Sequence, residues 1–178
     1  ADGAGGRTTF ERDERGRLLR STDPAGRTTT VRWDDSGHVV EVVDPKGGRT
    51  IDTFDYRGFI ESHQDPDGAL TTYRHDERGL LVEENDPVGA RTLIGYDHHG
   101  NAIDLQTPDG ARLQRTYDAY GNCTSEVDGY GNRIFLSYDD MDRCTSQTNA
   151  DGSRVHFEYD AEGRLVRQGQ DGYAPIVL

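Results

Sequence analysis

Residues 117–131, which read YDAYGNCTSEVDGYG, contain the unit from which this chain of 178 residues is built. The aspartate of this stretch, Asp118, recurs every 21 residues, at Asp13, Asp34, Asp55, Asp76, Asp97, Asp139 and Asp160. A second position is glycine in every unit: Gly5, Gly26, Gly47, Gly68, Gly89, Gly110, Gly131 and Gly152. A fixed period of this size is typical of a repeat array and not of a conventional globular domain.

A third repeated position lies three residues after the aspartate and holds glycine, except at Asp142. The three positions share one register, which defines units near residues 5–25, 26–46, 47–67, 68–88, 89–109, 110–130, 131–151 and 152–172. The chain starts and stops within this pattern. We therefore expect residues 1–178 to be a single repeat array taken from a longer repeat region.

Each unit predicts a β-hairpin. Residues 26–37, GRTTTVRWDDSG, alternate through Thr29, Val31 and Trp33, which is the pattern of a strand with one face inward. Residues 38–43, HVVEVV, predict the returning strand. Most connections read Asp-x-x-Gly, in which the aspartate can bond the backbone of the turn and the glycine accepts a positive φ. The sequence thus predicts an all-β fold of eight consecutive hairpins in a curved antiparallel sheet.

An aromatic residue precedes most of the repeated aspartates and predicts an aromatic ladder on one face of the sheet, since residues two apart share a face. The expected structural signature comprises Trp33, Asp34, Gly37, Phe54, Asp55, Gly58, Tyr96, Asp97, Gly100, Tyr117, Asp118, Gly121, Tyr138, Asp139, Tyr159, Asp160 and Gly163. Cys123 and Cys144 occupy one slot of successive hairpins, about 9 to 10 Å apart at 4.8 Å per strand. A disulfide needs Cα atoms within about 7 Å, so we predict two free thiols.

The composition limits the core and the partners. Only 32% of the residues are hydrophobic and 30% are charged, so a single thick core is not expected. The net charge of −13 argues against nucleic acid and anionic membranes as partners. No stretch is apolar enough to insert into a membrane, and residues 1–20 are too polar for a signal peptide. We expect the cellular address to be encoded outside this sequence.

The reactive side chains form no pattern that predicts catalysis or metal binding. The six histidines fall at different repeat positions. The acidic turn at residues 65–68 lacks the spacing of known calcium loops. No serine, cysteine or threonine stands out with a base and an orienting acid. We therefore expect no enzymatic activity, no metal and no cofactor, and interpret the repeated aspartates as turn residues.

An arginine recurs two residues after the glycine that is present in every unit. It is found at Arg7, Arg49, Arg91, Arg112, Arg133 and Arg154. One interpretation is a ladder of arginines that reach turn carboxylates or carbonyls of neighbouring hairpins. The other is a stripe that lines a lumen or contacts a ligand. The sequence leaves both open.

The aromatic residue and aspartate, followed by glycine and then asparagine or arginine, closely resemble the tyrosine-aspartate repeat of the rearrangement-hotspot (Rhs) family of polymorphic toxins. Examples are Tyr96-Asp97 with Gly100-Asn101 and Tyr159-Asp160 with Gly163-Arg164. The resemblance covers nearly all of the chain and includes the DPxG turns between units. Related repeats occur in insecticidal toxin complexes, wall-associated proteins and teneurins.

The resemblance implies an arc of a spiralling β-shell that encloses a C-terminal toxin domain of a secreted bacterial effector and holds it inactive. The implied partners are the remaining repeats and the enclosed toxin, in a secreted or cell-surface parent protein that a contact-dependent system could deliver. The cleavage segment of self-cleaving members and a toxin domain are both missing. The alternative is an exposed module that recognises glycans or proteins. We also expect the sheet edges to self-associate.

Overall fold

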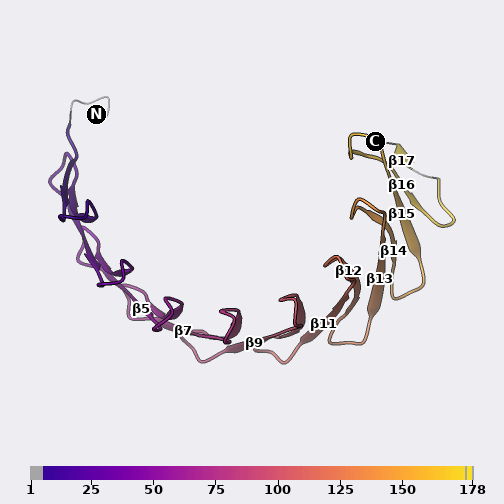
Figure 1. The fold of residues 1–178 in the computed structure, drawn as a ribbon, viewed down its shortest axis with the longest axis horizontal. Coiled ribbons are helices and arrows are strands. Elements are labelled where there is room, and N and C mark those ends of the chain that lie inside the picture. The colour runs from indigo at the N-terminus through magenta and orange to yellow at the C-terminus, as the bar shows by residue number, and fades with distance from the viewer. Residues whose placement is uncertain (1–5, 175, 178) are drawn as a thin grey trace. The chain divides into compact units, whose positions relative to one another are not determined.

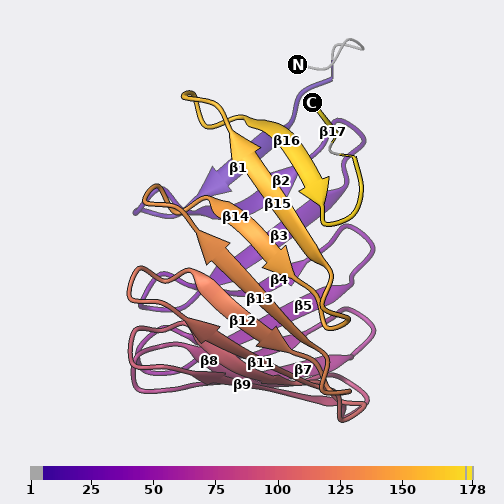
Figure 2. The ribbon, with the colours of Figure 1, turned by 90° about the vertical axis from the view of Figure 1, so that its right-hand side faces the viewer.

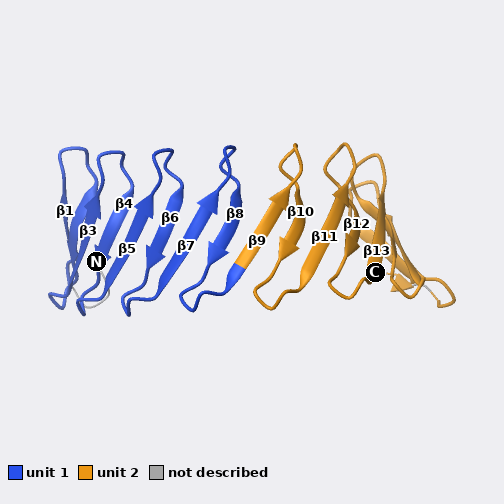
Figure 3. Ribbon diagram, turned by 90° about the horizontal axis from the view of Figure 1, so that it is seen from below, with its two compact units in different colours: residues 1–91 blue, residues 92–178 orange. Residues whose placement is uncertain are grey.

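The computed structural model describes residues 6–174, 176 and 177, and its elements there are all β-strands. The chain divides into two compact units, residues 1–91 and 92–178, which are coloured separately in Figure 3. Among the described residues, none lies in a helix that could cross a bilayer.

Unit 1 contains four antiparallel hairpins in chain order. Its strands are β1 (Thr9–Arg12), β2 (Leu18–Thr22), β3 (Thr28–Trp33), β4 (Val39–Val43), β5 (Arg49–Phe54), β6 (Ile60–Gln64), β7 (Leu70–His75) and β8 (Leu81–Asn85). Each strand pairs with the next.

Unit 2 repeats this meander and is seen face on in Figure 2. Its strands are β9 (Arg91–Tyr96), β10 (Ala102–Gln106), β11 (Arg112–Tyr117), β12 (Cys123–Val127), β13 (Arg133–Tyr138), β14 (Cys144–Thr148), β15 (Arg154–Tyr159), β16 (Leu165–Gln170) and β17 (Ile176–Val177). Within each unit the successive hairpins follow a curve (Figure 1). The predicted all-β array of eight hairpins is therefore confirmed, from β1–β2 to β15–β16.

Every hairpin has the same irregular register. In β3–β4, Arg32 lies opposite Glu41 but Trp33 lies opposite Val39, so one residue of the second strand is bulged out of the pairing. Neighbouring hairpins pair over a shorter stretch, as between β2 and β3, where Arg20 is opposite Thr30 and the ladder ends. The hairpins are thus paired at the DPxG end and diverge toward the end that carries the repeated aspartates.

The turns contain the glycines in the left-handed conformation that the Asp-x-x-Gly pattern predicted, with φ of 92° at Gly121 and 83° at Gly131, for example. The repeat without this glycine uses Asp142 instead, with φ of 58°, and it is the one non-glycine residue with positive φ among those described. Aspartate tolerates this region better than most residues but still at some cost.

The sheet has no thick core. None of the hydrophobic side chains in the described part of the chain is fully buried. Many of the aromatic and aliphatic side chains lie half-buried on one face, the aromatic face, which includes Val31, Trp33 and Tyr138. The opposite face, here the polar face, carries residues such as Arg32, Glu41 and Arg49, because side chains alternate along each strand.

Candidate functional site

The turns that contain the repeated aspartates share one hydrogen-bond pattern. In the turn after β11, Oδ1 of Asp118 accepts the backbone N–H of Tyr120 and of Asn122, both at 2.9 Å. Asn122 also donates from Nδ2 to Oδ2 of the same aspartate at 3.2 Å. The backbone N–H of Asn122 is the main reason that the pKa of Asp118 lies below its ordinary value. The aspartate thus acts as a turn residue, satisfying donors that the sharp bend leaves unpaired.

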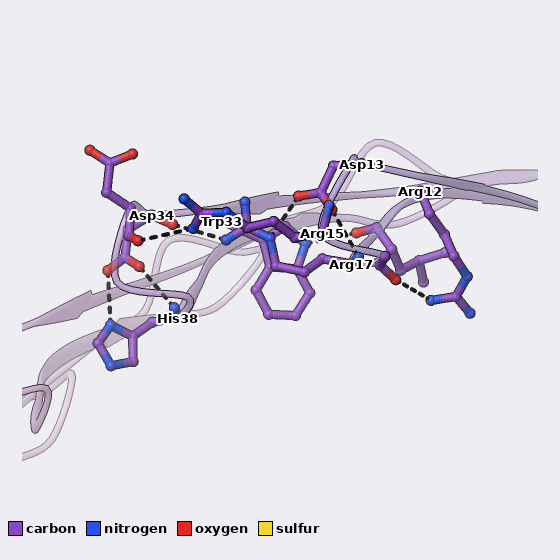
Figure 4. Close-up of polar contacts among 10 residues, drawn as sticks. Arg12, Asp13, Arg15, Arg17, Trp33, Asp34 and His38 are labelled. Atoms are coloured by element: carbon purple, nitrogen blue, oxygen red, sulfur yellow. Dashed lines mark hydrogen bonds and ion pairs between the residues drawn. The ribbon is translucent and has the colours of Figure 1, made fainter.

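Arginines link one such turn to the next. Arg17 donates from Nε to Asp13 at 2.6 Å and from Nη1 to the carbonyl of Asp34 in the next hairpin at 3.2 Å, and its guanidinium lies 5.5 Å from the centre of the Trp33 ring (Figure 4). In unit 2, Arg143 makes the equivalent contacts with Asp139, the Asp160 carbonyl and the Tyr159 ring. Both arginines directly follow the turn glycine position, but their link to the next turn was not predictable from the repeat pattern.

The aromatic residue before the aspartate bonds to the previous hairpin. Trp33 donates from Nε1 to the carbonyl of Leu18 at 2.7 Å (Figure 4). In unit 2, the hydroxyls of tyrosines donate to the carbonyl 15 residues earlier: Tyr117 to Ala102 at 3.0 Å, Tyr138 to Cys123 at 2.9 Å and Tyr159 to Cys144 at 2.9 Å. These carbonyls belong to the first residue of each second strand, where the hairpins diverge, so the side chain replaces the missing ladder bond.

The other predicted signature residues also lie in the turns or at the junctions between hairpins. Phe54 cannot donate a hydrogen bond and instead stacks on His38, with ring centres 4.4 Å apart. His38 in turn bonds Asp34 at 2.9 Å. Gly37, Gly58, Gly100, Gly121 and Gly163 all have positive φ. Asp34, Asp55, Asp97, Asp139 and Asp160 each accept the backbone N–H four residues later.

The recurring arginines lie on the polar face, and their partners correct the first interpretation. Arg91 contacts Glu83 at 2.9 Å and Arg112 contacts Asp104 at 2.7 Å. These carboxylates lie within strands β8 and β10 and not in turns. In this register Arg112, the first residue of β11, lies opposite Gln106, the last residue of β10. Its side chain reaches diagonally along the same face to Asp104, which lies opposite Gln114. Turn carbonyls are reached by Arg17 and Arg143 instead.

Glu83 is held from both sides on this face. Its side chain is 15% exposed and receives bonds from Arg91 and from Arg74. Hydrogen bonds from Arg91, Arg74 and Asn85 lower the pKa of Glu83 to about 2. Glu41 is held in the same way by the arginines at the equivalent repeat positions, Arg32 and Arg49.

The chemistry available to these side chains is limited. The described residues contain no group of three or more histidine, cysteine or carboxylate side chains placed to hold a metal ion. Cys123 and Cys144 are free, as predicted. Partial burial raises the pKa of both thiols, which favours the unreactive protonated form. The repeated contacts therefore serve to join hairpins.

Comparisons with known proteins agree with this architecture. A family model described as the RHS repeat matches residues 1–28, 12–50, 54–91, 96–133 and 138–172. No curated protein matches the sequence. Among solved structures, that of TcdB2-TccC3-Cdc42 matches with a TM-score of 0.61 and 15% identity over 97% of this chain. That of TcdB2-TccC3 without its hypervariable C-terminal region matches with a TM-score of 0.60 and 18% identity over 95% of this chain.

The chain spans 12% of the length of each of these two solved chains. At this level of identity the likeness concerns the fold. The matched fold and the observed contacts together describe a structural repeat module.

Proposed function

The chain belongs to the RHS repeat family, and from this premise we propose that it forms part of the wall of a hollow β-shell that encloses a toxin domain and holds it inactive. The parent protein is then a secreted or cell-surface bacterial effector, and residues 1–178 are a piece of its repeat array. The partners of the chain are the neighbouring repeats and the enclosed domain.

One observation carries this proposal. Within each unit, successive hairpins are joined at the end where the strand ladder stops, in several cases through an aromatic donor such as Tyr138 or a turn-to-turn arginine such as Arg143. These bonds repeat along the chain and can continue through any number of hairpins, since each uses only the nearest neighbour. A continuous sheet without a thick core is what a wall requires.

The test uses the complete parent protein. We expect protease to leave the repeats and the segment that follows them intact under native conditions, and to digest that segment once urea opens the shell. The same segment expressed alone should be digested without urea. If the segment is cut equally fast in the parent and alone, encapsulation is wrong.

Exposed tyrosines favour a second function, the recognition of glycans or proteins by an exposed module. Tyr120 and Tyr130 lie at turns and are 85% and 93% exposed, and aromatic rings at such positions can stack on sugars. Binding of the chain to a glycan array, lost in Tyr120→Ala and Tyr130→Ala, would support this function over encapsulation.

We also propose that the isolated chain self-associates through its sheet edges. Among the described strands, β1 pairs with β2 alone, and Phe10 on this strand is exposed. Sedimentation should show association that increases with concentration, and a strict monomer at high concentration would contradict this.

A further inference from the structure

Two arginines on the polar face of unit 2 form no ion pair with any residue that the structure describes. Arg133, at the start of β13, lies against the ring of Phe135, with its guanidinium carbon 5.9 Å from the ring centre. Arg154, at the start of β15, donates from Nη2 to the hydroxyl of Ser146 at 3.1 Å. Both guanidinium groups thus lack a counter-charge in a chain whose net charge is −13.

In other hairpins, the arginine at this repeat position has a carboxylate partner. The arginine at the same repeat position contacts a carboxylate of the preceding strand in Arg49–Glu41, Arg91–Glu83 and Arg112–Asp104. In the next two hairpins the position of that carboxylate is taken by Ser125 and Ser146, which are only 9% and 4% exposed. Serine carries no charge, so the carboxylate is absent while the arginine remains.

The nearby acids on the polar face are already engaged. Asp104 binds Arg112 through both of its oxygens, at 2.7 and 2.8 Å. Glu158 pairs with Arg167 at 3.1 Å. Asp171, the residue opposite Arg154, contacts His156 at 3.1 Å. None of the carboxylates in the described part of the chain thus forms an ion pair with Arg133 or Arg154.

A groove gives access to the first of these arginines. It has a volume of about 600 Å³ and is lined by Arg112, Gln114, Thr116, Ser125 and Arg133, among others. Thr116 and Ser125 bond to each other through their hydroxyls at 2.8 Å. The lining of the groove thus includes Asp104, which is already paired with Arg112, and Arg133, which has no carboxylate partner among the described residues.

We propose that Arg133 and Arg154 form a binding site for the carboxylate side chains of an acidic polypeptide segment. Each partner carboxylate takes the place that Glu83 or Asp104 occupies within the chain itself. A carboxylate is favoured over other anions because three arginines at this repeat position already bind one, and the planar guanidinium matches it with two parallel hydrogen bonds. The inference goes beyond encapsulation, since it requires only a polypeptide with suitably spaced acids.

The strand spacing sets the spacing of those acids. Strands β13 and β15 are separated by β14, so Arg133 and Arg154 start about 10 Å apart at 4.8 Å per strand. In a polyproline-II conformation, with three residues per turn and a rise of about 3.1 Å, side chains three residues apart share one side and lie about 9 Å apart. A peptide with glutamate at every third position, EGSEGSEGS, therefore fits the pair, and QGSQGSQGS is its uncharged control.

The first test measures binding of the labelled peptides to the 178-residue chain by fluorescence polarisation at low salt. We expect the glutamate peptide to bind at least tenfold more tightly than the glutamine peptide. The double variant Arg133→Gln/Arg154→Gln should weaken binding at least tenfold, while Arg49→Gln, which removes an arginine already paired with Glu41, should change it less than twofold. Equal binding by wild type and the double variant would overturn the proposal.

A second test supplies the missing carboxylate from within the chain. Ser125→Glu/Ser146→Glu should occupy both arginines and weaken peptide binding at least tenfold. Ser62→Glu is the control, because Ser62 has the same repeat position but Leu70 stands where the arginine would be. Circular dichroism confirms that each variant is folded. Equal effects of the control and the double variant, or binding of a sulfated heparin fragment in place of the glutamate peptide, would overturn the assignment of a carboxylate ligand.

Discussion

The hydroxyl of Tyr138 provides a direct measure of how strongly one hairpin holds the next. Tyr138→Phe keeps the ring and removes only the bond to the carbonyl of Cys123, which is 2.9 Å long. Tyr138 is half-buried, and this burial raises the pKa of its hydroxyl. A hydrogen bond of this kind contributes about 1 kcal/mol to the free energy of unfolding.

The equivalent substitutions should add. Tyr117, Tyr138 and Tyr159 occupy one position of successive hairpins, about 10 Å apart, and sites at this separation usually act independently. The triple variant is therefore expected to lose about 3 kcal/mol. With a urea dependence of about 1.5 kcal/mol per molar, the midpoint of unfolding should fall by about 0.7 M for one substitution and about 2 M for three.

Urea unfolding followed by circular dichroism provides the assay. Tyr120→Phe and Tyr130→Phe are matched controls, because these side chains are 85% and 93% exposed and lie at turns. Their midpoints should stay within about 0.2 M of the wild type, since exposed substitutions have small effects. If Tyr138→Phe unfolds at the same urea concentration as the controls, the bond between hairpins does not contribute to stability.

Three further predictions concern the turns, the polar face and the thiols. Asp142→Gly relieves the strain of φ 58° but also removes the bond of 2.7 Å that the Asp142 carboxylate accepts from Asn122; made in an Asn122→Ala background, where that bond is already absent, it should raise the free energy of unfolding by about 0.5 kcal/mol in urea melts, and Asp142→Ala in the same background, which keeps a Cβ, should not raise it. Glu83 has a folded pKa of about 2 against an ordinary value of 4.5, so its contribution is complete above pH 4.5 and is lost as the pH falls toward 2; Glu83→Gln should flatten acid-unfolding curves in this window, and an unchanged curve would contradict the ion-pair account. Thiol titration of the unfolded, unreduced protein should find two reactive groups, Cys123 and Cys144, and an intramolecular bridge found by mass spectrometry would show that the strand register is wrong.

Much of the fold follows from the printed residues alone. The repeat of Asp118 with Gly121, and its equivalents, predicted turns at regular intervals, and the structure confirms hairpins there with Gly121 in the left-handed conformation. The shared repeat position of Cys123 and Cys144 predicted free thiols. These features were predictable because they depend on neighbours within one repeat, where backbone geometry and side-chain alternation decide the outcome.

The contacts of the candidate site were harder to predict from the sequence, because they join different hairpins. The sequence identified the recurring arginines but assigned turn groups as one set of possible partners, whereas Arg91 binds Glu83 in the adjacent strand. It also placed tyrosines such as Tyr138 on one face without indicating that their hydroxyls reach the previous hairpin.

The sequence by itself determined the period, the hairpin and the turn chemistry of this protein, since each is a local property of a repeated unit. The tertiary structure decided which side chains meet between hairpins, because the bulged residue in each second strand shifts the register and ends the ladder early. That shift leaves the carbonyl of Cys123 to accept the hydroxyl of Tyr138. In the same register, Ser125 occupies the repeat position that Asp104 holds one hairpin earlier. Asp104 pairs with Arg112, whereas the equivalent arginine, Arg133, has no carboxylate partner among the described residues.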